Sequence, residues 1–117
     1  MSSTNYYLTK GFSCLVKSVV VSGTDTMSVW VPKVGHRVVV TSVAISSNPA
    51  TTIAFYFDNG NDKIAGYNLG ASSNISPVIG AWESTVAGGR IFSKQAASQT
   101  DGTQINLTGF EIPVSAV

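Results

Sequence analysis

The apolar residues of this chain recur at every second position over most of its length, and this alternation restricts the fold more than any other feature. The stretch TTIAFYFD, for example, places Ile53, Phe55 and Phe57 on one side of an extended chain. Side chains of a β-strand alternate between two faces, and β-branched and aromatic residues favour strands. The pattern therefore predicts a chain built from strands, each with one apolar face and one face rich in hydroxyl groups.

Eight strands are predicted, separated by stretches that carry the Gly, Pro, Asn or Asp that turns require. Eight short strands with frequent turn signals indicate an all-β, antiparallel β-sandwich of the jelly-roll kind. An immunoglobulin-like sandwich is the alternative, although the Cys pair of antibody domains is absent. We expect an extended N-terminal arm at residues 1–14 and one β-sandwich domain at residues 15–117. The predicted strands span residues 15–22, 26–32, 37–46, 52–58, 63–69, 75–79, 90–96 and 104–113.

The low content of charged residues limits the kinds of molecule that this protein is expected to bind. Charged residues make up 11% of the 117 residues and the net charge is +1, whereas soluble domains usually contain roughly 25% charged residues. The lysines and arginines are scattered, so no basic stripe is available to neutralise a phosphate backbone, and we expect no nucleic-acid partner. A weakly charged surface with almost no net charge favours association with other protein.

Cys14 is the only cysteine, which excludes an intrachain disulfide and a Cys-based zinc site. A small buried hydrophobe is the simplest role for it. The N-terminal residues lack the basic start and unbroken apolar run of a signal peptide, and no segment approaches the roughly 18 apolar residues of a membrane helix. We therefore expect a soluble protein that is made in the cytoplasm and has no membrane partner.

The stretch DNGND, residues 58–62, has two interpretations. Asn-Gly between two alternating runs is a strong hairpin signal, because both residues tolerate the positive φ of a type I′ turn. A calcium loop would need several carboxylates at alternating positions and a bidentate acid further on. Here Asp58 and Asp62 are the only carboxylates, and Lys63 follows with a competing positive charge. A plain turn is the favoured interpretation, the metal site is the weaker one, and no cofactor is expected.

No catalytic constellation is evident in the sequence. His36 is the only histidine and follows Gly35 at the start of a predicted strand. No serine occupies a G-x-S-x-G elbow, and the acidic residues fall mostly in predicted turns or strand ends, where paired carboxylates for glycoside chemistry are not expected. We therefore expect a protein that is not an enzyme.

Three aromatic residues could instead form a binding platform. Trp30 is expected on the strand face opposite Val29, Trp82 in a loop, and Tyr67 on an outward face. Exposed aromatic rings on one sheet would stack against a sugar ring. The favoured alternative is packing, with Trp30 beneath the N-terminal arm or a neighbouring subunit and Trp82 closing one end of the sandwich.

The part of the chain that begins at Val38 contains VVVTSVAISSNPATTIAFYFDNGNDKIAGYNLG, then GAWESTVAGGRIFSK, then INLTGFEI. In the order of these elements it resembles the β-sandwich decoration, or cement, proteins on the outside of tailed-phage capsids. It resembles more loosely the jelly-roll domains of phage head fibres. The resemblance covers roughly two thirds of the chain and includes no catalytic motif.

The resemblance implies a viral structural protein on the outer capsid surface of the virion. Such a protein is expected to be a homotrimer at local threefold positions, where it bridges adjacent copies of the major capsid protein. By hypothesis, four apolar residues of the arm become ordered only on contact with the capsid or a neighbouring subunit. These residues are Tyr6, Tyr7, Leu8 and Phe12. The alternative is a fibre-head or other carbohydrate- or receptor-binding module, with Trp30, Tyr67 and Trp82 as its stacking surface.

Overall fold

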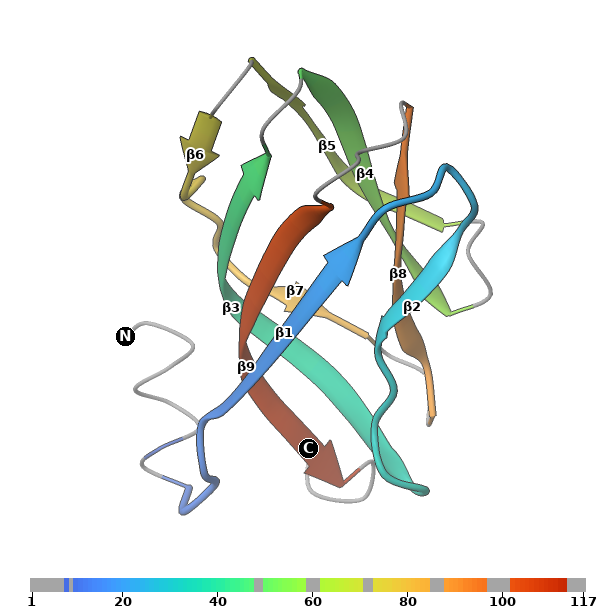
Figure 1. Cartoon of the computed structure of the whole chain (residues 1–117). Coiled ribbons are helices and arrows are strands. Elements are labelled where there is room, and N and C mark those ends of the chain that lie inside the picture. Colours follow the sequence, from blue (N-terminus) through green and yellow to red (C-terminus); the bar gives the residue numbers. More distant parts are fainter. Residues whose placement is uncertain are drawn as a thin grey trace.

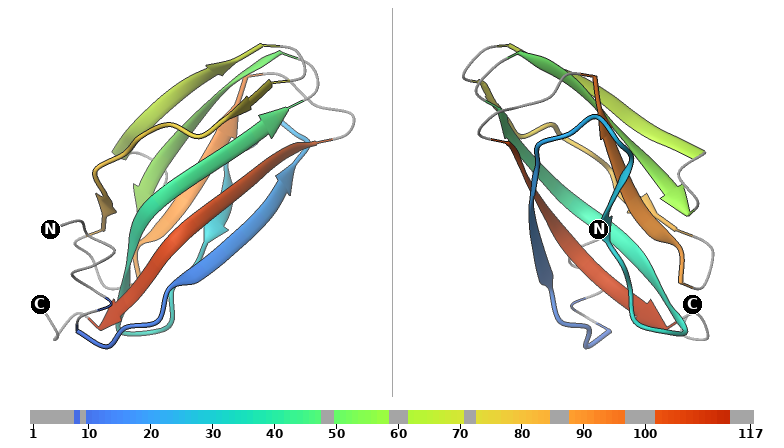
Figure 2. Two further views of the ribbon diagram at one scale, coloured as in Figure 1. Left: turned by 90° about the vertical axis from the view of Figure 1, so that its left-hand side faces the viewer. Right: turned by 45° about the vertical axis from the view of Figure 1, so that its right-hand side comes forward.

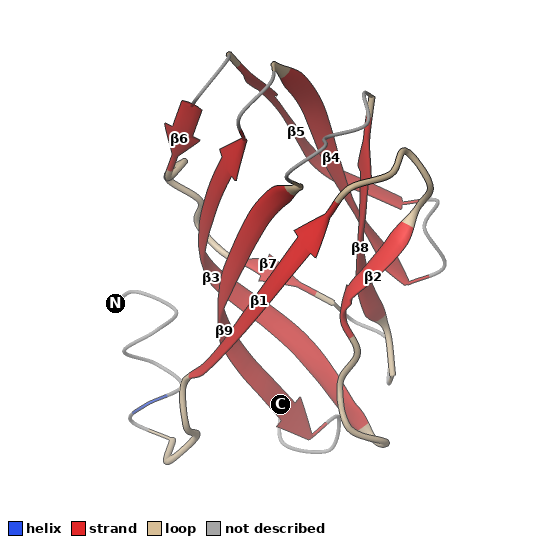
Figure 3. Cartoon of the chain, in the orientation of Figure 1, coloured by secondary structure: helices blue, strands red, loops and turns tan. Residues whose placement is uncertain are grey.

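A computed structural model describes residues 8, 10–47, 50–58, 62–70, 73–84, 88–96 and 102–113, with the side chains of Asp58 and Asp62 left out. This part of the chain forms two antiparallel sheets that pack face to face as a β-sandwich (Figure 1; Figure 3). Within it, no helix has the length and hydropathy needed to span a membrane. The predicted fold class is confirmed.

Nine strands lie in the described part of the chain. The first sheet has the order β1-β9-β3-β6, with β7 paired to β3 beside this path, and the second sheet has the order β2-β8-β4-β5. The strands are β1 (Leu15–Val21), β2 (Met27–Trp30), β3 (His36–Ser47), β4 (Thr51–Asp58), β5 (Asp62–Leu69), β6 (Ser73–Ile75), β7 (Trp82–Glu83), β8 (Arg90–Gln95) and β9 (Thr103–Pro113).

The strand pairs are nested. β4 pairs with β5, β3 with β6, β2 with β8 and β1 with β9, so the chain forms one long antiparallel ribbon that folds over on itself. The pairings of β9 with β3 and of β8 with β4 then complete the two sheets. This is the arrangement of a jelly roll. The immunoglobulin-like alternative is wrong, because that fold pairs its first two strands within one sheet.

Two strands differ from the prediction. The sixth strand was expected at residues 75–79 but spans Ser73–Ile75, because Pro77 has no backbone N–H to donate to a ladder. β7 was not predicted at all. It has only two residues, and it forms because β6 pairs with one end of β3 and leaves Val39 and Val40 free to pair with Glu83 and Trp82.

The main core lies between the two sheets and contains both tryptophans. The ring of Phe55 lies 5.1 Å from the ring of Trp82, centroid to centroid, and 6.3 Å from that of Tyr67. Complete burial of each large apolar side chain contributes about 1.5–3 kcal/mol. The buried members are Val21, Val29, Trp30, Val38, Val40, Val43, Ile45, Ile53, Phe55, Leu69, Trp82, Ile91, Ile105 and Leu107.

A second, smaller cluster lies on the opposite side of the first sheet. Because Val38 and Val40 belong to the main core, the alternation of β3 turns Val39 outward, yet Val39 is fully buried together with Phe110 and Ile112 of β9. Phe12 and Ala81 pack against these three side chains. We call this group the outer cluster. It fixes the N-terminal segment to the outside of the sandwich.

Candidate interaction surfaces

The aromatic platform, which the sequence analysis offered as the weaker alternative to packing, is not formed by the two tryptophans. Trp30 is 1% exposed and Trp82 is 7% exposed, both within the main core. Tyr67 is half-buried and packs edge-on against Phe55. The error at Trp30 has a local cause: the register of β2 against β8 shifts between Ser28 and Trp30. Such a bulge breaks the period of two, so Trp30 and its neighbour Val29 are both buried.

A polar cluster holds the Trp30 indole in place. Its Nε1–H donates to Glu111 Oε2 at 2.9 Å, and the backbone N–H of Lys33 donates to Glu111 Oε1 at 3.0 Å. The Nζ of Lys17 lies 5.9 Å from the centroid of the Trp30 ring. Burial raises the pKa of Glu111, but these two hydrogen bonds and the positive charges of Lys17 and Lys33 outweigh burial, and the pKa is lowered below 4.5. This cluster joins β9 to the loop after β2.

The N-terminal arm is partly attached to its own domain. Phe12 is half-buried in the outer cluster, and its contact with a capsid or a neighbouring subunit stays a prediction. Leu8 is exposed, and its carbonyl accepts a hydrogen bond from the backbone N–H of Gly11 at 3.0 Å. Tyr6 and Tyr7 lie outside the described residues, so the prediction for them stands untested.

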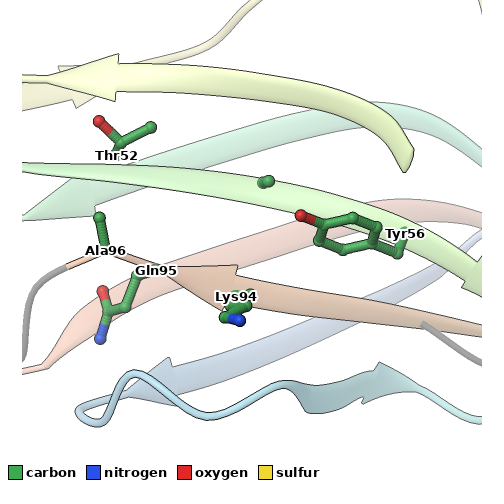
Figure 4. Close-up of a pocket in the computed structure, with 6 residues that line it drawn as sticks. Thr52, Tyr56, Lys94, Gln95 and Ala96 are labelled. Atoms are coloured by element: carbon green, nitrogen blue, oxygen red, sulfur yellow. The ribbon is translucent and has the colours of Figure 1, made fainter. Parts of the chain in front are cut away.

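A shallow hollow lies on the outer face of the second sheet, over Ala54 (Figure 4). Its volume is about 240 Å³. Thr52 and Tyr56 border it on β4, and Lys94 borders it on the neighbouring β8, where Lys94 pairs with Ala54. A second hollow of about 430 Å³ adjoins the first and shares Thr52 and Ala96 with it.

The side chains around these hollows can bind but do not form a catalytic pair. The Thr52 hydroxyl donates to Asn68 Oδ1 at 2.9 Å, and Gln95 directs its amide into the protein toward the carbonyls of Val21 and Gly23. What remains toward solvent is one half-buried tyrosine, one exposed lysine and the Thr52–Asn68 pair. An aromatic face with hydroxyl, amide and amine groups suits a small polar ligand such as a sugar.

The other residues singled out from the sequence take separate positions. Cys14 is exposed, which corrects the expectation of a buried side chain. His36 is half-buried, and its Nδ1 lies 3.0 Å from the carbonyl oxygen of Val34. Among the described residues, no three His, Cys, Asp or Glu side chains come close enough to hold a metal.

The DNGND stretch joins β4 to β5, which pair as an antiparallel hairpin, so the hairpin prediction is confirmed. Residues 59–61 and the side chains of Asp58 and Asp62 lie outside the described parts. The candidate metal site at these two carboxylates therefore stays an untested prediction.

The chain was compared with protein-family models, curated proteins and solved structures, and only solved structures are similar to it. Neither a protein-family model nor a curated protein matches the chain. Among solved structures, a chain of the cyanophage Pam1 capsid asymmetric unit is similar, with a TM-score of 0.52 and 19% identity over 84% of this chain and 83% of that one. A protein of Bacillus endospore appendages, which are disulfide-linked pili, has a TM-score of 0.47 and 9% identity over 86% of each chain. The sugar-binding EclA C-terminal domain has a TM-score of 0.42 and 14% identity over 82% of this chain and 74% of that one. The chain thus has a β-sandwich fold that also occurs in a phage capsid.

Proposed function

We propose that this protein is a phage structural protein that decorates the outer surface of a capsid and has no enzymatic activity. The observation that supports this most directly is the similarity of its sandwich, over 84% of the chain, to a chain of the cyanophage Pam1 capsid asymmetric unit. The low content of charged residues agrees with this role, since a neutral, hydroxyl-rich surface is weakly repelled by neighbouring protein.

A decoration protein stabilises a shell through mass action. A ligand that binds the assembled shell and not the free subunits shifts the equilibrium toward the shell, by about 2.7 kcal/mol per site at a concentration 100 times the Kd. The partner in this proposal is the major capsid protein, and the protein bridges adjacent copies of it. The predicted homotrimer at local threefold positions belongs to the same proposal.

The N-terminal arm is the proposed capsid contact. Phe12 fixes the arm to the outer cluster of its own domain, and Leu8, four residues earlier, is exposed. Tyr6 and Tyr7 precede this fixed point in the sequence. Phe12 therefore serves as the anchor of the arm, and the three residues before it supply the apolar side chains that contact the capsid.

Binding to capsids tests the proposal directly. Purified chain is mixed with empty capsids that lack it, and the bound amount and the temperature of shell dissociation are measured. We expect saturable binding at one homotrimer per local threefold position and a higher dissociation temperature. Deletion of residues 2–9 should abolish binding and leave the melting temperature of the domain unchanged, because the deletion spares Phe12. Absence of binding by the intact chain would refute the proposed function.

A glycan-binding module is the second candidate, and the hollow over Ala54 favours it. Tyr56 offers an aromatic face there, beside the hydroxyl of Thr52 and the amine of Lys94. The test is a glycan array probed with the intact chain and with Tyr56→Ala. Binding that the intact chain shows and the variant loses would favour this candidate, and binding that both show would exclude the hollow as the site.

A further inference from the structure

The strands at the edges of the two sheets differ in how well they are protected. Natural sheets protect their edges with short strands, bulges or charged residues, because an open edge can pair with another chain. Here β6 has three residues and β7 has two. β2 has four residues and an irregular register, and β5 has a register shift opposite β4, with Lys63 beside Gly66. β1 is the least protected of these edges: its one charged residue is Lys17, whose Nζ lies 5.9 Å from the centroid of the Trp30 ring, and the strand has seven residues, an unbroken register with β9, and neither Gly nor Pro.

β1 also has apolar side chains on its solvent face. Val16 is 64% exposed and Val20 is 55% exposed. Between them Ser18 donates a hydrogen bond from its hydroxyl to Asn106 Oδ1 at 2.6 Å, which ties this face to β9. In the left panel of Figure 2, β1 is the outermost strand of its sheet, with β9 along one side. An exposed, regular and β-branched edge of this kind is a template for strand pairing.

The sequence of β1 indicates which strand fits. LVKSVVV is nearly symmetric about Ser18, with Val16 and Val20 two positions to either side. We propose that β1 pairs antiparallel with β1 of a second copy of this chain, with the twofold axis at Ser18. Val16 of one copy then faces Val20 of the other on the solvent side, and Lys17 faces Val19 on the inner side. The two first sheets become one continuous sheet across the contact.

Charge determines the register. If the axis lay at Lys17, the two lysines would stand directly opposite each other, and like charges in that position are destabilising. If it lay at Val19, Leu15 would face Gly23, which is beyond the end of the strand. The register about Ser18 is the one that pairs the full strand and keeps the lysines apart. The same patch is used on both copies, as in most soluble dimers.

This inference goes beyond the proposed function and holds whether or not the protein binds a capsid. A twofold contact through β1 is distinct from the threefold contact of the predicted homotrimer. It predicts a dimer if β1 makes the only contact between copies, and a larger assembly of linked homotrimers if the homotrimer also forms. A shell decorated by such copies would carry links between neighbouring homotrimers.

Substitution of Val16 and Val20 by charged residues tests the register of the proposed β1–β1 pairing. The mass of the intact chain is measured by sedimentation over a wide range of concentrations, alongside two double variants. Val16→Lys with Val20→Lys places lysines opposite lysines twice, and we expect dimerisation to weaken at least about tenfold. Val16→Lys with Val20→Glu places opposite charges in contact twice and should restore dimerisation. Val34→Lys with Val78→Lys is the matched control, because it adds the same charge at two exposed loop valines and should leave dimerisation unchanged.

Hydrogen exchange of the intact chain provides a second test that needs no variant. Every second backbone amide of β1 points away from β9, and these amides should become protected as the concentration rises. The proposal is overturned if the intact chain forms no even-numbered assembly at any concentration. It is also overturned if the variant with two lysines still dimerises as the intact chain does, or if the lysine–glutamate variant fails to restore dimerisation. Loss of capsid binding with β1 pairing intact would overturn the proposed function alone.

Discussion

Replacement of the buried Gln95 by leucine should destabilise the sandwich, and by more than replacement of the buried Ser93 by alanine. Gln95 is buried in β8 of the second sheet and reaches across to the first sheet. Its Nε2 donates to the carbonyl of Val21 at 3.0 Å and to that of Gly23 at 2.9 Å, and its Oε1 accepts from the Thr103 hydroxyl at 2.6 Å. One side chain thus connects β8 to both β1 and β9.

The loss of unfolding free energy depends on which hydrogen-bond partners of Gln95 would be left without a polar contact. Gly23 is exposed, so water can replace the amide there, whereas Val21 and Thr103 are fully buried. A buried polar group without a partner costs about 1–3 kcal/mol, so two of them cost about 2–6 kcal/mol. Burial of the leucine side chain offsets about 1.5–3 kcal/mol of this. The middle values of these two ranges give a net loss of about 2 kcal/mol, which lowers the Tm by about 10 °C in a domain of this size.

The assay is urea unfolding with linear extrapolation of the free energy, applied to a double-mutant cycle. Thr103→Val removes the hydroxyl that Gln95→Leu leaves without a partner, so the double variant should lose about 1–2 kcal/mol less than the sum of the single variants. Ser93→Ala is the control on the same strand. The Ser93 hydroxyl is buried and has no hydrogen-bond partner in the described structure, so its removal should cost less than about 0.5 kcal/mol. A cost below about 1 kcal/mol for Gln95→Leu, or strict additivity in the cycle, would refute this reasoning.

Three further predictions concern other parts of the fold. Gly109→Ala should cost about 1–3 kcal/mol in urea unfolding, because a Cβ there would overlap the backbone of Val39, whereas Gly80→Ala, in open space, should cost far less. The lowered pKa of Glu111 stabilises the fold above pH 4.5, and this contribution is lost as the pH falls through the folded-state pKa. The Tm of the intact chain should therefore fall more steeply in acid than that of Glu111→Gln, and parallel curves would contradict this. Phe12→Ala should leave the sandwich folded, cost less than about 2 kcal/mol and speed proteolysis within residues 8–14; an unchanged cleavage rate would show that Phe12 does not anchor the arm.

The alternation of apolar residues was sufficient to predict the architecture but not the local exceptions to it. Ile53, Phe55, Ile105 and Leu107 are buried on the faces that the period of two assigns to them, because regular strands keep that period. The prediction for Trp30 was wrong because a bulge adds one residue to a strand relative to its partner. The sequence of a strand does not show where such an extra residue will fall, because this depends on the pairing with the other strand.

Other features depended on contacts between distant residues. β7 is a strand only because β3 has unpaired length beside it. The outer cluster could have been suspected from the run Val38, Val39, Val40, in which three consecutive apolar residues leave one on the outer face. What covers that residue is Phe12, 27 positions earlier in the chain, and no local pattern links the two.

The arm and β1 belong to the first sheet and the hollow belongs to the second, and this separation makes the hollow independent of the other two contacts in experiment. The arm is anchored on the outer face of the first sheet, and β1 is an edge of that same sheet. The hollow beside Tyr56 lies on the outer face of the second sheet. A copy held to a capsid through the first sheet would keep this hollow open to solvent. Tyr56→Ala should therefore leave capsid binding and self-association unchanged, whichever ligand the hollow takes. A loss of capsid binding in Tyr56→Ala, with the Tm unchanged, would instead place the capsid contact on the second sheet and remove the arm from that role.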